Sequence, residues 1–262
     1  MPKEIWRVVI LAAVRGPDDP MAKAFGIGHK CALPIAGKPM LTWVVEALSA
    51  TRIQKPFVVS IDTAAPVLEA LGTDATNIVI LPSANSAPAS AMAAIATLGT
   101  YPILLTTGDH PLLTPDIIEH FLQAAKTSGA DVLAGLATAE VIQAAYPLTS
   151  RTYFNLGGTR VSGCNLFAVM NQNGLRMLEA WQDLERNRKK PWKLVAAFGL
   201  QPLIYYFIGR LTPARTFGLI SQRLGITVAP VFLPFAQAAI DVDKPSDHAL
   251  AEQILKARLT PT

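Results

Sequence analysis

The sequence predicts an α/β fold, a Rossmann-like three-layer sandwich with a mostly parallel sheet. Apolar, β-prone runs alternate with helical segments along the first half of the chain, which is typical of repeated βαβ units. The first run, RVVILAA at 7–13, is apolar almost throughout, as expected for a strand buried on both faces. With 262 residues, the chain is long enough for one large α/β domain with an insertion.

The elements of the first half follow one another in a regular order. Each expected strand leads into a segment with helical character, and Gly108 and Pro111 mark the exit from the fourth strand. The expected strands are 5–13, 56–61, 77–81, 102–106 and 131–137, and the expected helices are 40–50, 64–71, 88–98 and 115–127.

The second half continues with two β-rich runs, 153–158 and 159–169, which meet at Gly157-Gly158 and predict a hairpin. A helix is expected at 171–187. Residues 188–224 depart from this rhythm, because a basic cluster precedes an uncharged run at 194–209 that is broken by glycine and proline. That run is too short to span a bilayer, which needs about 20 apolar residues. We therefore predict a single domain, 1–262, that carries a helical insertion at 188–224, followed by strand-like ITVAPVFL and AAIDVD and a helix at 245–257.

Composition narrows the class of protein. The hydrophobic fraction is 51%, only 16% of residues are charged, and the net charge is +4. This charge suits phosphorylated ligands but is too small to indicate nucleic acid, and no nucleic-acid-binding motif accompanies it. Cys31 and Cys164 lack the spacing of a zinc site or a disulfide framework. The N-terminal apolar run is interrupted by Arg15 and does not resemble a signal peptide, so we expect a cytoplasmic protein.

Three motifs carry the functional information. The first strand ends in LAA and leads through a long loop to KCALPIAGKPM at 30–40; TTGDHPLL follows at 106–113, and DVDKPSD at 241–247. In this order and at these distances, the motifs resemble those of nucleotidyltransferases of the sugar-nucleotide and molybdenum-cofactor guanylyltransferase type. The resemblance implies a GT-A-like fold and transfer of a nucleoside monophosphate from a nucleoside triphosphate to a phosphorylated acceptor, with release of pyrophosphate on a divalent metal.

The expected metal is Mg²⁺, which binds through one or two carboxylates and substrate phosphates. Asp109 follows an apolar strand, so its carboxylate should project from the carboxyl end of the sheet, where α/β proteins bind ligands. A cap of the following helix is the other explanation for Asp109, but Thr114 and Asp116 are better placed for that role. The second carboxylate should be Asp241 or Asp243, which we expect to point the same way in a strand-like segment, with Asp247 in the next helix.

The resemblance also implies the residues that hold the substrates. Lys30 corresponds to the family's phosphate-binding lysine, which with Asp109 forms the expected catalytic pair; Lys38 is either a second phosphate contact or a solvated turn residue. The SGCN segment resembles the acceptor side, with Asn165 contacting the acceptor and Arg160 its phosphate. The nucleotide-binding residues expected from the motifs are Ala12, Ala13, Arg15, Gly16, Lys30, Ser83, Asn85, Ser90 and Gly108.

The first loop departs from the family pattern, because Val14 stands where the family has glycine. Gly16, Gly26 and Gly28 offer substitute N–H groups for phosphate, since glycine adopts the turns that anion-binding nests require; a flexible surface loop is the alternative. The segment LPSANSAPAS at 81–90 resembles that of cytidylyltransferases, so CTP is favoured over GTP or ATP.

Two other functions remain open: a membrane-peripheral or regulatory binding protein on the same scaffold, and a glycosyltransferase that uses a sugar nucleotide. A nicotinamide oxidoreductase would need G-x-G-x-x-G after the first strand, which AVRGPDDP lacks. The partners expected are a nucleoside triphosphate and a phosphorylated small-molecule or lipid acceptor. Residues 188–224 are expected to form a homodimer interface or lid, or to contact the inner membrane surface as an interfacial hairpin.

Overall fold

A computed structural model describes residues 5–14, 19–187 and 210–260. The chain divides into two compact units: unit 1 comprises residues 1–119 and 240–262, and unit 2 comprises residues 120–239. Unit 1 is therefore built from two stretches that are far apart in the sequence. Each unit is described separately below.

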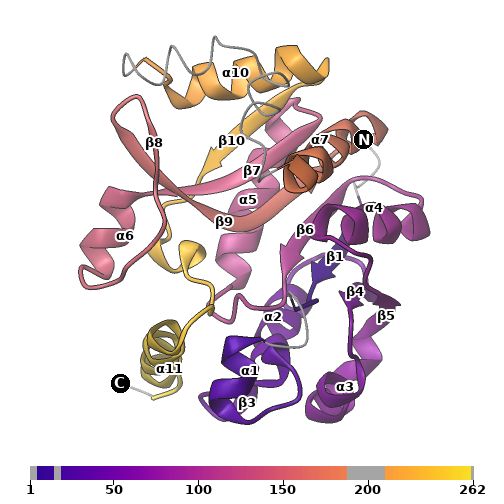
Figure 1. The fold of residues 1–262 in the computed structure, drawn as a ribbon, viewed down its shortest axis with the longest axis vertical. Coiled ribbons are helices and arrows are strands. Elements are labelled where there is room, and N and C mark those ends of the chain that lie inside the picture. The colour runs from indigo at the N-terminus through magenta and orange to yellow at the C-terminus, as the bar shows by residue number, and fades with distance from the viewer. Residues whose placement is uncertain (1–4, 15–18, 188–209, 261–262) are drawn as a thin grey trace. The chain divides into compact units, whose positions relative to one another are not determined.

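The strands of unit 1 form a parallel array in the order β6-β1-β4-β5 (Figure 1). All five residues of β4 are buried, and helix α4 packs on β1 and β4, so helices and loops cover both faces. The predicted α/β class with a largely parallel, covered sheet is confirmed. These strands are β1 (Arg7–Leu11), β4 (Phe57–Ile61), β5 (Ile78–Pro82) and β6 (Ile103–Thr107).

The helices of unit 1 begin and end where their sequences require. In α4, the Ser86 side chain accepts a hydrogen bond from Ala89 N–H, and Gly99 ends the helix in the left-handed conformation. A short hairpin precedes α2, and Ala36 and Gly37 both have positive φ at its turn. The helices and short strands are α1 (Pro20–Phe25), η1 (Lys30–Ala32), β2 (Pro34–Ile35), β3 (Lys38–Pro39), α2 (Met40–Ser49), α3 (Ala65–Leu71), η2 (Gly72–Asn77), α4 (Ala87–Leu98) and α11 (Pro245–Leu259).

Unit 2 contains a mixed sheet in which β7 pairs in parallel with β10 and antiparallel with β9, while β8 pairs with β9. The predicted hairpin joins β8 and β9, and Gly157 and Gly158 both have positive φ at its turn. The elements are β7 (Val132–Thr138), α6 (Ala139–Ala145), β8 (Phe154–Leu156), β9 (Thr159–Val169), η3 (Gln172–Gly174), α7 (Leu175–Asn187), α10 (Pro213–Leu224), β10 (Val228–Phe232) and η4 (Ala236–Ala239), and α5 (Pro115–Ser128) crosses the unit boundary.

The predicted insertion at 188–224 is described only at its C-terminal end, since residues 188–209 lie outside the described residues. Helix α10 lies on unit 2, where its apolar residues pack against a buried cluster that includes Val132 and Val228. These apolar residues are Phe217, Ile220 and Leu224. They are therefore engaged within the unit.

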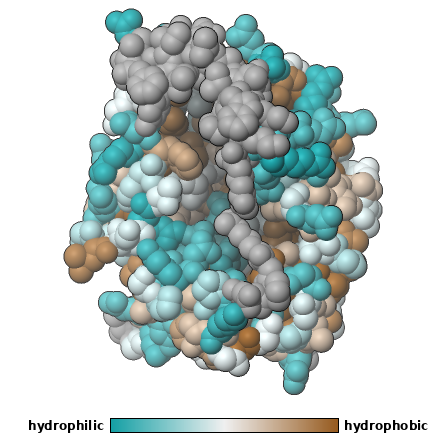
Figure 2. Space-filling model, viewed as in Figure 1, coloured by the Kyte–Doolittle hydropathy of each residue, from teal (hydrophilic) through white to brown (hydrophobic). Residues whose placement is uncertain are grey.

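The hydropathy of the surface and of the helices bears on membrane contact. On the face shown in Figure 2, hydrophobic residues are scattered among hydrophilic ones, and the described atoms gather into no continuous apolar patch there. None of the helices in the described ranges has the length and apolar character needed to cross a bilayer.

One strand prediction is wrong. Residues 240–243 form no strand but an irregular segment between η4 and α11. Residues 245–247 instead start a proline-initiated helix with a capping arrangement, which draws the chain out of an extended conformation.

Asp131 joins three segments of unit 2. Its carboxylate accepts hydrogen bonds from the Thr227 N–H at 2.7 Å and from the Asn171 side chain at 2.7 Å. The hydrogen bond from the Thr227 backbone, followed by that from Asn171, lowers the pKa of Asp131. The contribution of Asp131 to the free energy of unfolding is therefore present above the pKa of an aspartate in the unfolded chain, about 3.9. It is lost as the pH falls through the lower pKa of Asp131 in the folded protein.

We expect Asp131→Ala to lower the free energy of unfolding by about 1–3 kcal/mol at pH 7, because it removes two charge-assisted hydrogen bonds at a partly exposed site. The difference from the wild type should narrow below about pH 4. Urea unfolding at several pH values measures both effects, and Asp183→Ala, on the exposed face of α7, is the control. A difference that widens toward acid would contradict this account of Asp131.

Candidate active site

Lys30 is the centre of the site in unit 1. It begins the 3-10 turn η1, and its side chain is 10% exposed. Its ammonium donates hydrogen bonds to Asp109 Oδ2 at 2.9 Å and to Asp243 Oδ1 at 2.6 Å. Three of the sequence-predicted residues, which lie up to 213 positions apart, therefore meet at one point.

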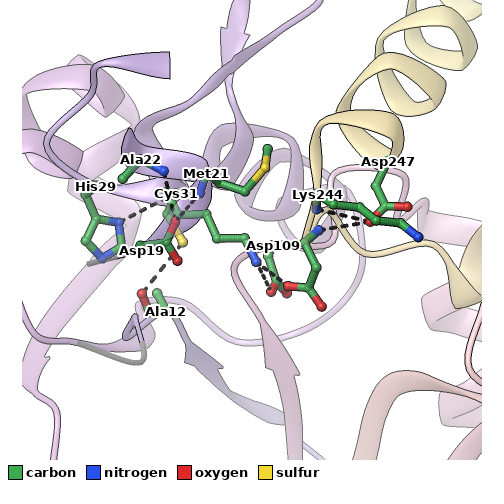
Figure 3. A network of polar contacts seen from close by, with 11 residues as sticks. Ala12, Asp19, Met21, Ala22, His29, Cys31, Asp109, Lys244 and Asp247 are labelled. Atoms are coloured by element: carbon green, nitrogen blue, oxygen red, sulfur yellow. Dashed lines mark hydrogen bonds and ion pairs between the residues drawn. The ribbon is translucent and has the colours of Figure 1, made fainter. Parts of the chain in front are cut away.

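Asp109 owes its position to close packing at the end of β6. The Gly108 N–H donates to Leu11 O at 2.9 Å, and a Cβ at Gly108 would lie 3.0 Å from Cys31 Sγ and 3.1 Å from Ala12 Cβ. A side chain at position 108 would push η1 away from the strand. Figure 3 shows Asp109 between the segment with His29 and Cys31 on one side and that with Lys244 and Asp247 on the other.

Asp243 is held by the start of α11. Asp247 is buried, and its Oδ2 accepts hydrogen bonds from the N–H groups of Asp243 and Lys244, both at 3.2 Å. The neighbouring Val242 N–H donates to the carbonyl of Asp109 at 3.0 Å. Capping and this backbone contact, rather than the alternation of a strand, direct Asp243 to Lys30. Of the two expected carboxylates, Asp241 and Asp243, it is Asp243 that accepts a hydrogen bond from Lys30. Asp247, which positions Asp243, was not identified as a site residue from the sequence.

Electrostatics keep Lys30 and Asp109 charged. Burial alone would lower the pKa of Lys30, but the carboxylates of Asp109 and Asp243 outweigh burial and raise it above its ordinary value. Burial raises the pKa of Asp109, but the Lys30 ammonium, together with Thr107 and His110, more than offsets burial, so the pKa of Asp109 lies below the usual range. Lys30 is consequently a permanent cation near neutral pH, whereas burial raises the pKa of the adjacent Cys31 thiol and keeps it neutral.

The site also suits a divalent cation. Asp109 Oδ1 is buried and makes no hydrogen bond to the described residues, while the Asp243 side chain is 66% exposed. Within the described ranges, no three His, Cys, Asp or Glu side chains are grouped so as to hold a metal alone. In nucleotide sites, Mg²⁺ is usually held by one or two carboxylates together with substrate phosphates, and Asp109 and Asp243 could supply these carboxylates.

The first loop differs from what its glycines predict. Arg15 and Gly16 lie outside the described residues. Gly26 is the left-handed C-cap of α1, and its N–H is bonded to carbonyls of that helix, so the expectation that it serves phosphate is wrong. Gly28 packs on Pro66, where a Cβ would lie 3.0 Å from the ring.

The residues expected to hold the base surround the turn after β5. Ser86, rather than Ser90, caps α4; Ser90 is buried one turn further on, and its hydroxyl accepts from Ala84 N–H at 2.9 Å. Ser90 thereby shapes the turn. Ser83 is half-buried, with its N–H bonded to Ile61 O, and Asn85 is exposed.

The two lysines of KCALPIAGKPM differ in surroundings. Lys38 donates to both carboxylate oxygens of Glu46, at 2.6 and 2.9 Å, and lies 4.7 Å from the centre of the Trp43 ring. It is neither a free turn residue nor in contact with the Asp109 carboxylate that holds Lys30.

Other predictions concern residues at helix starts and loops. The Thr114 hydroxyl accepts a hydrogen bond from the Ile117 N–H and so caps the start of α5. Asp109 is therefore not required as the cap of this helix. His110 lies in the loop after β6 and is buried there.

The expected acceptor residues belong to unit 2. Arg160 is exposed, donates to Gln143 Oε1 at 3.0 Å and lies 5.3 Å from the centre of the Tyr153 ring. Asn165 has a φ of +50° within β9, beside a register shift between β9 and β7. A non-glycine residue in this conformation at a bulge is often found next to functional sites, where the bulge redirects a side chain.

Comparison with known proteins decides the family. A sequence profile of the MobA-like NTP transferase domain matches residues 8–156, more than half of the chain. The chain belongs to the MobA-like NTP transferase family. It is accordingly a nucleotidyltransferase, and the predicted class of enzyme is confirmed. No curated protein matches the sequence.

Solved structures share the fold. A hypothetical transferase from Thermus thermophilus is 25% identical, with a TM-score of 0.78 over 94% of this chain and 100% of that one. CMP:2-keto-3-deoxy-manno-octonic acid synthetase, solved with CTP, is 14% identical, with a TM-score of 0.61 over 98% and 100%. The 2-C-methyl-D-erythritol 4-phosphate cytidylyltransferase of Thermus thermophilus is 16% identical, with a TM-score of 0.55 over 97% and 100%. The last two similarities concern the fold alone.

The contacts of the two lysines predict different effects on NTP-dependent turnover. Lys30→Met should reduce kcat/KM by about 10²–10³, because it removes a partly buried cation that stabilises charge in the transition state. Lys38→Met should change kcat/KM by less than about fivefold, because Lys38 is already paired with Glu46 in a half-exposed contact of the kind that contributes little. Pyrophosphate release measures both, and equal losses in the two variants would contradict the assignment of Lys30.

Proposed function

We propose that the protein transfers a nucleoside monophosphate from a nucleoside triphosphate to a phosphorylated acceptor and releases pyrophosphate. The main support is the buried Lys30 ammonium held between Asp109 and Asp243, in a chain of the NTP transferase family. A permanent cation and two carboxylates in one place provide electrostatic groups of both signs. Phosphoryl-type transfer depends mainly on such positioning and charge stabilisation.

Lys30 acts on the triphosphate as a point charge. The two carboxylates orient its ammonium, so little reorganisation is required when phosphate oxygens arrive as additional acceptors. As the bond from the α-phosphorus to the bridging oxygen breaks, negative charge grows on the leaving pyrophosphate. An ammonium that stays protonated neutralises this charge without transferring a proton.

Asp109 and Asp243 would hold Mg²⁺, through the unused Asp109 Oδ1 and the exposed carboxylate of Asp243. The bound cation would neutralise the triphosphate and polarise the α-phosphate. The nucleophile is an oxygen of the acceptor phosphate, so the protein needs to supply neither a covalent nucleophile nor a general base. Arg160 and Asn165 in unit 2 are proposed to bind the acceptor, either a small molecule or a lipid headgroup.

CTP is the proposed nucleotide. The segment LPSANSAPAS resembles the serine-containing segment of cytidylyltransferases, and Ser90 fixes the turn that carries Ser83 and Asn85. Short polar side chains and backbone groups at such a turn suit the small edge of a pyrimidine base.

Asp109→Asn tests the role of the carboxylate. We expect turnover to fall by about 10³ or more, because the neutral amide weakens the hold on both the metal and Lys30, and metal stabilisation contributes several kcal/mol to such reactions. Asp116→Asn, an exposed aspartate of α5, should retain activity within about twofold and serves as the control. Full activity of Asp109→Asn, or of the wild type in EDTA, would refute the mechanism.

The nucleotide is tested by incubating the protein with each NTP, Mg²⁺ and a fractionated extract of phosphorylated metabolites and phospholipids, and by following pyrophosphate release. We expect CTP to give the highest rate and to raise Tm most in a thermal-shift panel. A rise in Tm with GTP alone would exclude CTP as the substrate. Release of a free nucleoside diphosphate from a sugar nucleotide would indicate a glycosyltransferase.

A further inference from the structure

The segment that follows β4 contacts both ends of the first loop, which we define as the residues between β1 and η1. Asp62 lies directly after the last residue of β4, and Pro66 lies in the first turn of α3. The residues they touch are Val14 at the start of the loop, and Gly28 and His29 at its end. His29 is immediately followed by Lys30.

A single carboxylate oxygen joins the two ends. Asp62 Oδ1 accepts a hydrogen bond from the Val14 N–H at 3.1 Å and lies 3.3 Å from His29 Nε2. The Asp62 side chain is 34% exposed, whereas that of His29 is 1% exposed. The loop is thus closed by one partly exposed acid and one buried ring.

The backbone determines which histidine nitrogen carries the proton. His29 Nδ1 accepts a hydrogen bond from the Cys31 N–H at 3.0 Å, so Nδ1 bears no proton. The ring proton is therefore on Nε2, where it is donated to Asp62. In this way His29 caps η1 with one nitrogen and fastens that turn to Asp62 with the other.

Packing adds a third contact from the same segment. A Cβ at Gly28 would lie 3.0 Å from Pro66 Cγ and 3.3 Å from Pro66 Cβ, so the chain just before His29 lies directly on the proline ring. The end of the loop is fixed by this contact and by the His29 hydrogen bonds together.

We propose that Asp62 and His29 are positioning residues that hold Val14 and Lys30, at the two ends of the first loop, in the arrangement that receives the triphosphate. The inference rests on the proposed function. Fixing both ends of the loop before binding reduces the conformational entropy that is lost when the nucleotide binds. The Val14 N–H, at the position where the family has glycine, is then engaged by Asp62 rather than by phosphate.

The kinetic test compares Asp62→Ala, Asp62→Asn and His29→Asn. Asp62→Ala should raise the KM for the nucleotide about tenfold and leave kcat within about threefold, because the entropic cost of ordering Val14 and His29 falls on binding. Asp62→Asn keeps an oxygen acceptor at the same place and should restore most of the affinity. His29→Asn keeps an acceptor for the Cys31 N–H but cannot reach Asp62, so it should resemble Asp62→Ala, and the double variant Asp62→Ala/His29→Asn should be no worse than either.

Glu69→Ala removes an exposed charge from α3 and should leave KM unchanged, so it controls for the loss of charge near the site. Hydrogen exchange of the nucleotide-free protein provides a readout that does not depend on activity. The Val14 amide should exchange at least about tenfold faster in Asp62→Ala than in Glu69→Ala, with the β4 amides unchanged.

The outcomes separate the inference from the proposed function. If the wild type is active and Asp62→Ala has the same KM, the positioning role of Asp62 is refuted while the proposed function stands. The same holds if Asp62→Asn is as impaired as Asp62→Ala. Unchanged exchange at Val14 does the same. A wild type that neither binds nor converts any NTP overturns the proposed function, and the positioning role with it, even if the exchange rates change.

Discussion

The ion pairs of Lys30 are the constraint on which the rest of the site depends. A lysine that is 10% exposed is costly to bury unless its charge is compensated, and Asp109 and Asp243 compensate it. Each carboxylate is in turn fixed by the backbone: Asp109 by the close approach of Gly108 to β1 and η1, and Asp243 by the cap at the start of α11. The same arrangement makes the ammonium available to phosphate, because a carboxylate and a phosphate oxygen present similar acceptors.

The need to compensate the charge of Lys30 also explains why the site is built from residues that follow strands and start helices, rather than from residues in the middle of these elements. The carboxyl ends of β1, β4 and β6 lie at one edge of a parallel array. Ala12 and Asp62 directly follow β1 and β4, and Asp109 lies two residues after the end of β6. The side chain of a residue just after a strand can face solvent, while the backbone next to it is held by the hydrogen bonds of the sheet. An acidic and a basic group can therefore be oriented firmly and still exchange partners with a ligand.

Much of the fold was predictable, because the strands are apolar runs bounded by glycine, proline and polar turns. Lys30, Asp109 and Asp243, which the structure brings together, could be proposed from the sequence because they lie in motifs with recognisable order. The strand expected at 240–243 was wrong because the cap of α11 determines the path there, and capping by Asp247 is a local effect that apolar patterning does not reveal. Asp62 and His29 were missed because 33 residues separate them and neither lies in a motif, although Asp62 could have been found by the strand-end argument used for Asp109.

The discontinuity of unit 1 has a consequence for how the site forms during synthesis. Residues 1–119 contain the whole parallel array of unit 1, but Asp243 and the helix that caps it are translated only after unit 2. A nascent chain that has just exposed β6 thus carries Lys30 with one carboxylate instead of two. The growing chain can build the scaffold early, but the second ion pair of Lys30 forms only after residues 240–247 have been synthesised.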